Sequence, residues 1–160
     1  MDARIGLASL KRTEGATTDF AVSGPFGQDT AVGLITIPAD RVVTAAGQLS
    51  SVGDGVLVTG RVEAQLDAQC ARCLTDFSYP ASAEFEELYV YPEQAERYAD
   101  EDVWFVESGE IDLAPIIHDA LILDQPPIVL CQPDCRGLCP DCGANLNDQP
   151  DHHHGSSSPA

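Results

Sequence analysis

The chain has 160 residues, 44% hydrophobic and 21% charged, so it can bury a core and is not disordered as a whole. Eight Lys and Arg residues stand against 26 Asp and Glu residues, which gives a formal net charge of −18. Such a surface repels phosphates, which excludes a protein that mainly wraps nucleic-acid backbone, and it favours basic partners. No apolar run reaches about 18 residues, and the N-terminus lacks the apolar region of a secretory signal. We therefore expect a cytoplasmic protein with no membrane segment, whose six cysteines are metal ligands or free thiols.

The first segments of the chain predict short strands separated by turns. Residues 20–22 form an expected strand that Gly24 and Pro25 end, and residues 31–38 have the composition of a strand stopped by its proline. Residues 48–55 are rich in Gly and Ser, so we expect a loop there.

The clearest pattern is a strict alternation over residues 56–70. Apolar or small residues occupy the even positions and mostly polar residues the odd ones, which predicts a long antiparallel strand with one solvated face. The pattern puts Cys70 on the core side, at the end of this strand.

A second alternation, over residues 75–91, predicts the next strand. The parity of its apolar positions changes at Glu86 and Glu87, which is the pattern of a β-bulge. Pro80 has no backbone N–H to donate, so we expect it at a sheet edge or a bulge. A short loop around Cys70 and Cys73 would join the two strands.

The stretch 84–112 holds eleven acidic residues and one basic residue, Arg97. One interpretation is a solvated surface that only confers solubility, in which case recognition would use Arg72 and the cysteine loops. The other is a docking face for a basic partner. The candidate contacts of that face are Glu86, Glu87, Glu93 and Glu96.

Residues 112–123 predict a helix. Asp112 suits an N-cap, Pro115 is tolerated in the first turn, and apolar residues follow at helical spacing. We therefore predict an α+β fold: a curled antiparallel β-sheet, partly barrel-like, with this helix covering an apolar face and a C-terminal cysteine-rich metal loop. Residues 1–147 would form a single domain, with the cysteine-rich loop at 131–147, and residues 148–160 a flexible polar tail.

Four cysteines fall within the twelve residues 131–142. Zn²⁺ prefers soft ligands in a tetrahedron, and thiolates supply them. Cys139 and Cys142 flank a Cys-Pro-Asp-Cys-Gly turn, in which glycine permits the positive φ of a zinc knuckle. We predict about one zinc ion per chain, in a structural role, because four thiolates leave no open position for water.

The sequence is compatible with two sets of four zinc ligands. The local quartet is the simpler choice, and it consists of Cys131, Cys135, Cys139 and Cys142. The alternative pairs Cys70 and Cys73 with Cys139 and Cys142, across the 65 residues 74–138. One of the histidines 152–154 could also replace a thiolate.

The motifs in this order resemble the YceD family. The resemblance rests on Cys70-Ala-Arg-Cys73-Leu74, on Gly109-Glu-Ile-Asp112-Leu113 before a helix, on Cys131, and on Gly137-Leu-Cys-Pro-Asp-Cys-Gly-Ala-Asn-Leu-Asn147. It covers about residues 15–147. It implies a role in the accumulation of large-subunit ribosomal RNA, and hence a basic ribosomal protein or a pre-ribosomal particle as partner.

Charge and resemblance together predict a non-enzymatic factor in large-subunit assembly, for which direct contact with rRNA stays open. The alternatives are a zinc-dependent RNA-processing enzyme and a thiol redox or metal-sensing module, for which Cys70 and Cys73 would be the reactive pair. The sequence contains no phosphate-binding glycine loop, G-x-S-x-G or H-E-x-x-H motif, so we predict no catalytic residue.

Overall fold

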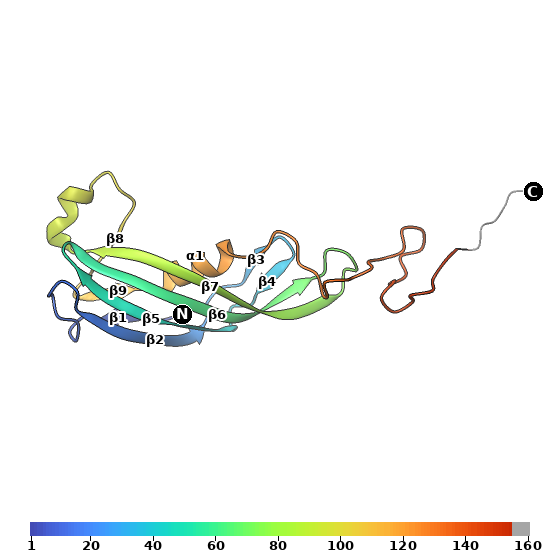
Figure 1. The fold of residues 1–160 in the computed structure, drawn as a ribbon, viewed down its shortest axis with the longest axis horizontal. Helices are drawn as coiled ribbons and strands as arrows, with labels where there is room; N and C mark the ends of the chain where they lie inside the picture. Colours follow the sequence, from blue (N-terminus) through green and yellow to red (C-terminus); the bar gives the residue numbers. More distant parts are fainter. Residues whose placement is uncertain (155–160) are drawn as a thin grey trace, which may run out of the picture.

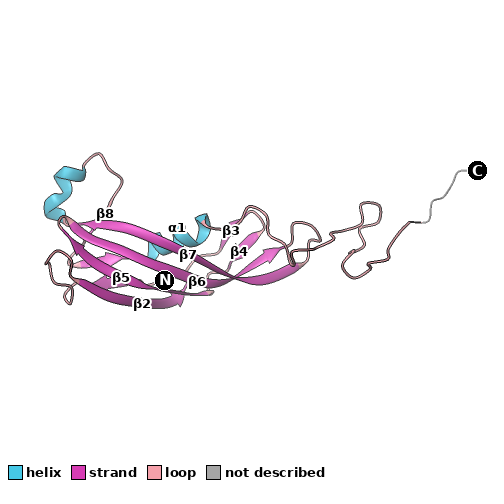
Figure 2. Ribbon diagram, viewed as in Figure 1, coloured by secondary structure: helices cyan, strands magenta, loops and turns pink. Residues whose placement is uncertain are grey.

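The computed structural model describes residues 1–154. Strands supply most of its regular structure and run along the length of the molecule (Figures 1 and 2). The strands are β1 (Arg4–Gly6), β2 (Thr17–Pro25), β3 (Thr30–Val32), β4 (Ile35–Ile37), β5 (Val42–Val52), β6 (Gly55–Gln69), β7 (Asp76–Val90), β8 (Trp104–Phe105) and β9 (Glu110–Asp112). The helices are the 3₁₀-helix η1 (Pro92–Tyr98) and the α-helix α1 (Ala114–Leu123).

The main sheet is built on β6, which is paired on both sides. All of β6 pairs antiparallel with β7, from Gly55 opposite Val90 to Gln69 opposite Asp76. On its other side β6 pairs first with β5 and then with β4. Beyond these lie β2 and β3, and β8 adds a short parallel pairing to β7. The predicted antiparallel sheet is confirmed, but within residues 1–154 it stays open between the β2 and β7 edges, so the barrel-like part of the prediction is not.

The side chains at the even-numbered positions of β6 point into the core. Val56, Val58, Val62 and Leu66 are all fully buried. Gly60 interrupts this row because a Cβ there would lie 2.6 Å from Cζ of Phe85 and 3.0 Å from Cζ of Phe20. These two rings fill the space that the glycine leaves. The predicted strand and its buried face are thus confirmed.

Helix α1 packs against β6 and β7 and buries Ile116, Ile117 and Leu121. The predicted covering helix is confirmed, with a different start. Asp112 ends β9, which pairs with β1, and Leu113 is the N-cap. The Asp112 carboxylate still accepts a hydrogen bond from the Ala114 N–H, at 3.0 Å.

Three predictions about the strands were wrong. Residues 31–38 form the β3–β4 hairpin, which turns at Gly33 with a φ of +59°. Residues 48–52 belong to β5 rather than to a loop, because β2 and β6 flank them and bury Leu49 and Ser51. Glycine and serine are compatible with a strand where neighbours on both sides satisfy the backbone.

The third wrong prediction is the bulge at Glu86 and Glu87. The register of β7 against β6 runs unbroken, and Tyr89 is buried on the same face as Phe85. The apparent change of parity arises because Val90, on the opposite face, is buried where β8 pairs with β7. Pro80 lies on β7, whose outer side pairs with β8 only at Tyr89 and Val90. Pro80 is therefore at an edge of the sheet, as predicted.

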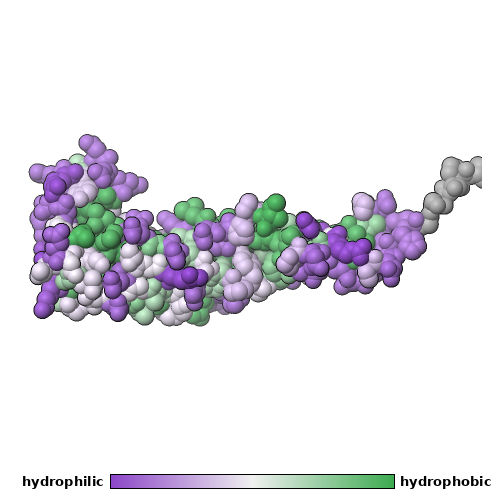
Figure 3. Space-filling view, viewed as in Figure 1, coloured by the Kyte–Doolittle hydropathy of each residue, from purple (hydrophilic) through white to green (hydrophobic). Residues whose placement is uncertain are grey.

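The molecule is elongated, and its two ends differ (Figure 1). The β6–β7 ribbon separates η1 at one end from the loop at Cys70 and the C-terminal segment at the other, over roughly 45 Å at ~3.3 Å per residue. Hydrophilic side chains gather at both ends, with hydrophobic surface between them (Figure 3). Among residues 1–154, no helix has both the length and the apolar character needed to cross a bilayer.

Candidate functional sites

Four cysteines from two distant segments meet at one end of the sheet. Cys70 and Cys73 come from the β6–β7 turn, and Cys131 and Cys135 from the loop after α1. Their sulfur atoms all lie within 4.8 Å of one another. Cys70 Sγ lies 3.7 Å from Cys135 Sγ, and Cys73 Sγ lies 3.6 Å from Cys131 Sγ. We call this group the buried cluster, because Cys70, Cys73 and Cys135 are at most 5% exposed.

The sulfur separations of the buried cluster fit a tetrahedral metal ion. Four sulfurs that each lie ~2.3 Å from one zinc ion are about 3.8 Å apart. Leu130, Leu138 and Phe77 pack around the cysteines and keep water from the sulfurs. The donor set is purely thiolate and suits a closed structural zinc site.

Backbone hydrogen bonds shape the two arms of the buried cluster. In the turn, the Cys70 N–H donates to the Thr75 carbonyl and the Leu74 N–H to the Cys70 carbonyl, with Leu74 at a φ of 59°. The Ala71 N–H donates to the Val129 carbonyl at 2.9 Å, which brings the second arm beside the turn. This hydrogen bond joins the two arms without the help of an ion.

Arg72 and Gly137 lock the second arm onto the turn. The Arg72 guanidinium donates to the Cys135 carbonyl at 2.9 Å. Gly137 has a φ of 76°, and a Cβ there would lie 3.2 Å from the Arg72 carbonyl oxygen. The Asn147 side-chain amide donates to Cys135 Sγ at 3.3 Å. Such contacts around a metal site orient its ligands.

The environment favours thiolates at two of these cysteines. Burial alone would raise the pKa of Cys70, but backbone N–H groups of Cys73, Cys131 and Arg72 outweigh it and lower that pKa to about 6. The Thr75 hydroxyl and backbone N–H lower the pKa of Cys73. Burial and the neighbouring cysteines raise the pKa of Cys131 to about 12, so Cys131 keeps its proton at neutral pH. A cation would displace that proton.

A second group gathers further along the C-terminal segment. It consists of Cys139, Cys142, His152 and His154, and its ligand atoms also lie within 4.8 Å of one another. Cys139 is buried, whereas Cys142 and His154 are exposed. Backbone N–H groups of Asp141 and Cys142 lower the pKa of Cys139 to about 6, and the hydrogen bond to Cys139 raises the pKa of His154. We call this group the exposed cluster.

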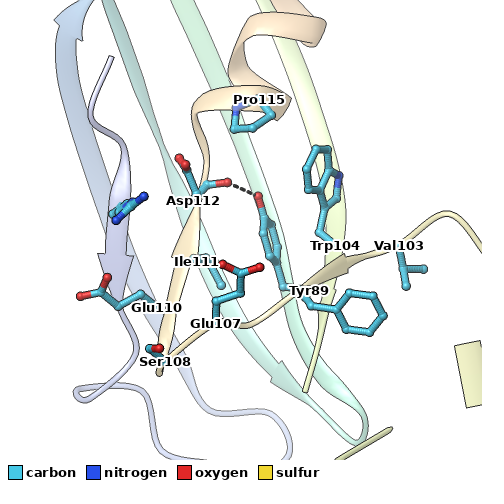
Figure 4. A pocket seen from close by; sticks show the side chains of 11 residues that line it. Tyr89, Val103, Trp104, Glu107, Ser108, Glu110, Ile111, Asp112 and Pro115 are labelled. Carbon is cyan, nitrogen blue, oxygen red and sulfur yellow. Dashed lines mark hydrogen bonds between the residues drawn. The ribbon is translucent and has the colours of Figure 1, made fainter. Parts of the chain in front are cut away.

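A pocket of about 390 Å³ lies at the opposite end of the molecule, between β7, β8 and β9 (Figure 4). Its aromatic wall is Trp104 stacked at 6.3 Å on Tyr89, whose hydroxyl donates to the Asp112 carbonyl at 2.6 Å. Burial, and then the charges of Asp112 and Glu87, raise the pKa of Tyr89 well above its ordinary range. The hydroxyl therefore stays a donor. Glu107 and Glu110 stand on the rim of the pocket.

The predicted docking residues lie at this same end, which we call the acidic end. Two of these residues, Glu86 and Glu87, lie on β7, and the other two, Glu93 and Glu96, lie on η1. All four side chains are exposed. Two of the nearby arginines are paired with acids, Arg12 with Glu93 at 2.7 Å and Arg97 with Asp54 at 2.6 Å, while the exposed Arg4 lines the pocket. The predicted contact Arg72 lies at the other end.

The sequence of residues 58–160 matches the model of the family described as "Large ribosomal RNA subunit accumulation protein YceD". The chain belongs to the YceD family. An uncharacterized protein of Mycobacterium tuberculosis (strain ATCC 25618 / H37Rv) is 35% identical over 159 residues, which cover 97% of this chain and 76% of the relative. One of Mycobacterium leprae (strain TN) is 31% identical over 155 residues, or 96% and 71% of the two chains.

A shorter match connects the chain to a plant protein. The "Large ribosomal RNA subunit accumulation protein YCED homolog 1, chloroplastic" of Zea mays is 47% identical over 38 residues, which are 24% of this chain and 13% of the relative. No solved structure matches the chain significantly. The YceD match includes both cysteine clusters and the acidic end, and leaves β1 to β5 outside it.

The structure groups the cysteines of this YceD protein differently from both predicted quartets. Cys131 and Cys135 join Cys70 and Cys73, while Cys139 and Cys142 join His152 and His154. Cysteines that are close in sequence stay together in the structure, since each short Cys–Cys spacing places both of its cysteines in one cluster. The sequence predicts at most one histidine in place of a thiolate, whereas the structure brings His152 and His154 together; their i, i+2 spacing is the signal that both could face one site. Of the tail predicted at 148–160, residues 155–160 lie outside the described residues.

Proposed function

We propose that this YceD protein is a non-enzymatic, cytoplasmic factor that supports assembly of the large ribosomal subunit and accumulation of its rRNA by binding a basic ribosomal protein or a pre-ribosomal particle. The family description and the name of the maize relative support the process. The partner and its mode of binding are inferred from charge and geometry.

The observation that carries the proposal is the unbalanced charge at the acidic end. Glu86, Glu87 and Glu96 are exposed there, and residues 84–112 hold eleven acidic residues against one basic residue, Arg97, which is paired with Asp54. A Lys- or Arg-rich partner would supply the missing positive charge. Long-range attraction of this kind speeds association at low salt and fades over ~8–10 Å at physiological salt. The same charge opposes direct binding of rRNA phosphates.

The pocket of Figure 4 offers a defined contact within the acidic end. Trp104 and Phe105 are 36% and 40% exposed, so both rings present apolar surface to solvent at the acidic end. A lysine or arginine of the partner could lay its aliphatic stem on these rings and direct its charge to Glu107 or Glu110. This arrangement would select a cationic side chain over other polar ones.

The buried cluster supplies a structural zinc site in this proposal. Cys70, Cys73, Cys131 and Cys135 would hold the ion, which when bound cross-links the β6–β7 turn to the loop after α1. Four thiolates leave no coordination position for a water nucleophile, which speaks against the zinc-dependent RNA-processing enzyme. The proposed roles are thus divided: recognition at the acidic end and cross-linking at the cysteine end.

The test neutralises the acidic end without altering the fold. Glu86→Gln, Glu87→Gln, Glu93→Gln and Glu96→Gln together should weaken binding to basic large-subunit proteins and lower large-subunit rRNA in cells. Thermal stability should hardly change, because all four side chains are exposed and the Arg12–Glu93 ion pair that is lost lies on the surface. The matched control changes four exposed acids away from the acidic end: Asp40→Asn, Asp119→Asn, Asp124→Asn and Asp134→Asn.

The outcomes separate the models. Loss of binding in the first variant alone supports the acidic end, and equal loss in both variants would mean that only net charge matters. If both variants bind normally while Arg72→Ala abolishes binding and rRNA accumulation, the contact lies at the cysteine end instead. Cleavage of precursor rRNA by the purified protein would favour the enzyme, and a reversible dithiol–disulfide mass change that controls binding would favour the redox module.

A further inference from the structure

The exposed cluster has the donor geometry of a metal centre. Cys139 Sγ lies 3.1 Å from His154 Nε2, and Cys142 Sγ lies 3.3 Å from His152 Nε2. The two Nε2 atoms are 3.3 Å apart, with the imidazole rings edge to face at 5.0 Å. Two sulfurs and two ring nitrogens therefore converge on one point. Zinc takes four ligands of this kind, at ~2.3 Å for sulfur and ~2.0–2.1 Å for nitrogen.

The local backbone is folded so that each pair of ligands faces the other. The Gly143 N–H donates to the Cys139 carbonyl and the Cys139 N–H to the Ala144 carbonyl, each at 2.8 Å, and Gly143 has a φ of 74°. The segment after Asn145 then returns, with Arg136 donating to the Pro150 carbonyl at 2.9 Å. This return brings residues 152–154 back over the Cys139–Cys142 turn.

The middle histidine of the run behaves differently from its neighbours. His153 Nδ1 lies 2.6 Å from the Asp151 carbonyl, and this histidine is not part of the cluster. An extended segment points alternate side chains to opposite sides, so a shared ion can use residues 152 and 154 but not 153. The Asp141 carboxylate lies 3.8 Å from His154 Nε2 and adds negative charge beside the site.

We propose that Cys139, Cys142, His152 and His154 bind a second zinc ion, distinct from that of the buried cluster, so that the chain carries two ions rather than one. This inference is independent of the ribosomal role, since it concerns metal content alone. The two sites differ in access: the buried cluster is closed off by Leu130, Leu138 and Phe77, whereas Cys142 and His154 are exposed. The second ion therefore exchanges with solution first. Its loss releases residues 152–154 from the Cys139–Cys142 turn, while residues 145–150 stay held by their hydrogen bonds to residues 132–138.

The experiment measures zinc per chain in full-length protein purified without a histidine tag, a chelator or an immobilised-metal step. We expect two ions in the wild type and one in Cys139→Ser/Cys142→Ser. In His152→Asn/His154→Asn the second ion should be lost or bound at least tenfold more weakly, because two thiolates alone hold it. His153→Asn is the matched control and should keep two. The histidine variants change only exposed or half-buried side chains, so they cannot fail by unfolding the sheet.

Cobalt substitution identifies the ligands of each ion. Sulfur-to-cobalt charge-transfer absorption grows with the number of thiolates, so the ion lost from the histidine double variant should show two thiolates and the remaining ion four. A wild-type content of one ion that Cys139→Ser/Cys142→Ser does not lower would overturn the proposal. So would a histidine double variant that binds two ions as tightly as His153→Asn does.

Discussion

Replacing Gly137 by alanine should weaken zinc binding at the buried cluster by about 5- to 30-fold. The φ of Gly137 is 76°, and a Cβ there would lie 3.2 Å from the Arg72 carbonyl oxygen. An alanine in the left-handed region costs about 1–2 kcal/mol, and 1.4 kcal/mol corresponds to about a factor of ten in an equilibrium constant. The ion-bound loop must keep this conformation, whereas the ion-free loop can relax, so the strain acts against binding.

The assay is competition for zinc against a chromophoric chelator at neutral pH, carried out in the Cys139→Ser/Cys142→Ser background so that only the buried cluster is measured. Gly15→Ala is the control: its φ is 84°, no atom lies within 4 Å of the added Cβ, and it is far from either cluster. It should lower stability without changing zinc affinity. If Gly137→Ala binds zinc as tightly as its background, Gly137 does not lock the second arm onto the turn.

Four further outcomes are expected. Leu121→Ala should lower the free energy of unfolding by about 2–5 kcal/mol in urea titrations, because Leu121 is fully buried on the side of α1 that faces the sheet. Leu123→Ala, at 81% exposure, should change it little, and equal effects would contradict the covering role of α1. Gly60→Ala should cost about 1–3 kcal/mol through its contact with Phe85, and Phe85→Leu in the same chain should recover part of that loss if the contact is the cause. Removal of metal by a chelator should collapse the NMR dispersion of residues 131–154 while the β6 amides stay protected from exchange, and an unchanged spectrum would argue against both ions. Trp104 is the single tryptophan of the chain and lines the pocket, so a basic large-subunit protein should change its fluorescence, and Glu107→Gln/Glu110→Gln should weaken that response; a response that survives the double variant would place the contact elsewhere.

Much of the sheet could be predicted from local patterns. The alternation over residues 56–70 identified β6 and its buried face, and the apolar spacing after Asp112 identified the covering helix α1. These predictions succeed because the period of a strand or helix is a property of neighbouring residues. The same method failed at residues 48–52, where Leu49 and Ser51 are buried only because β2 and β6 lie on either side of β5.

The cysteine clusters show the same division at the level of the site. The short Cys–Cys spacings and the low content of basic residues, read from the sequence alone, pointed to metal ligands and to a cationic partner. Which pairs of cysteines meet was decided by tertiary structure, where the Ala71–Val129 hydrogen bond places Cys131 and Cys135 beside the turn that carries Cys70 and Cys73. Cys139 and Cys142 are left to meet the histidines that follow them. Ligands that are close in sequence can be recognised by spacing, whereas the partner of each pair depends on how the whole chain packs, because a loop of many residues can close on several partners at nearly the same entropic cost.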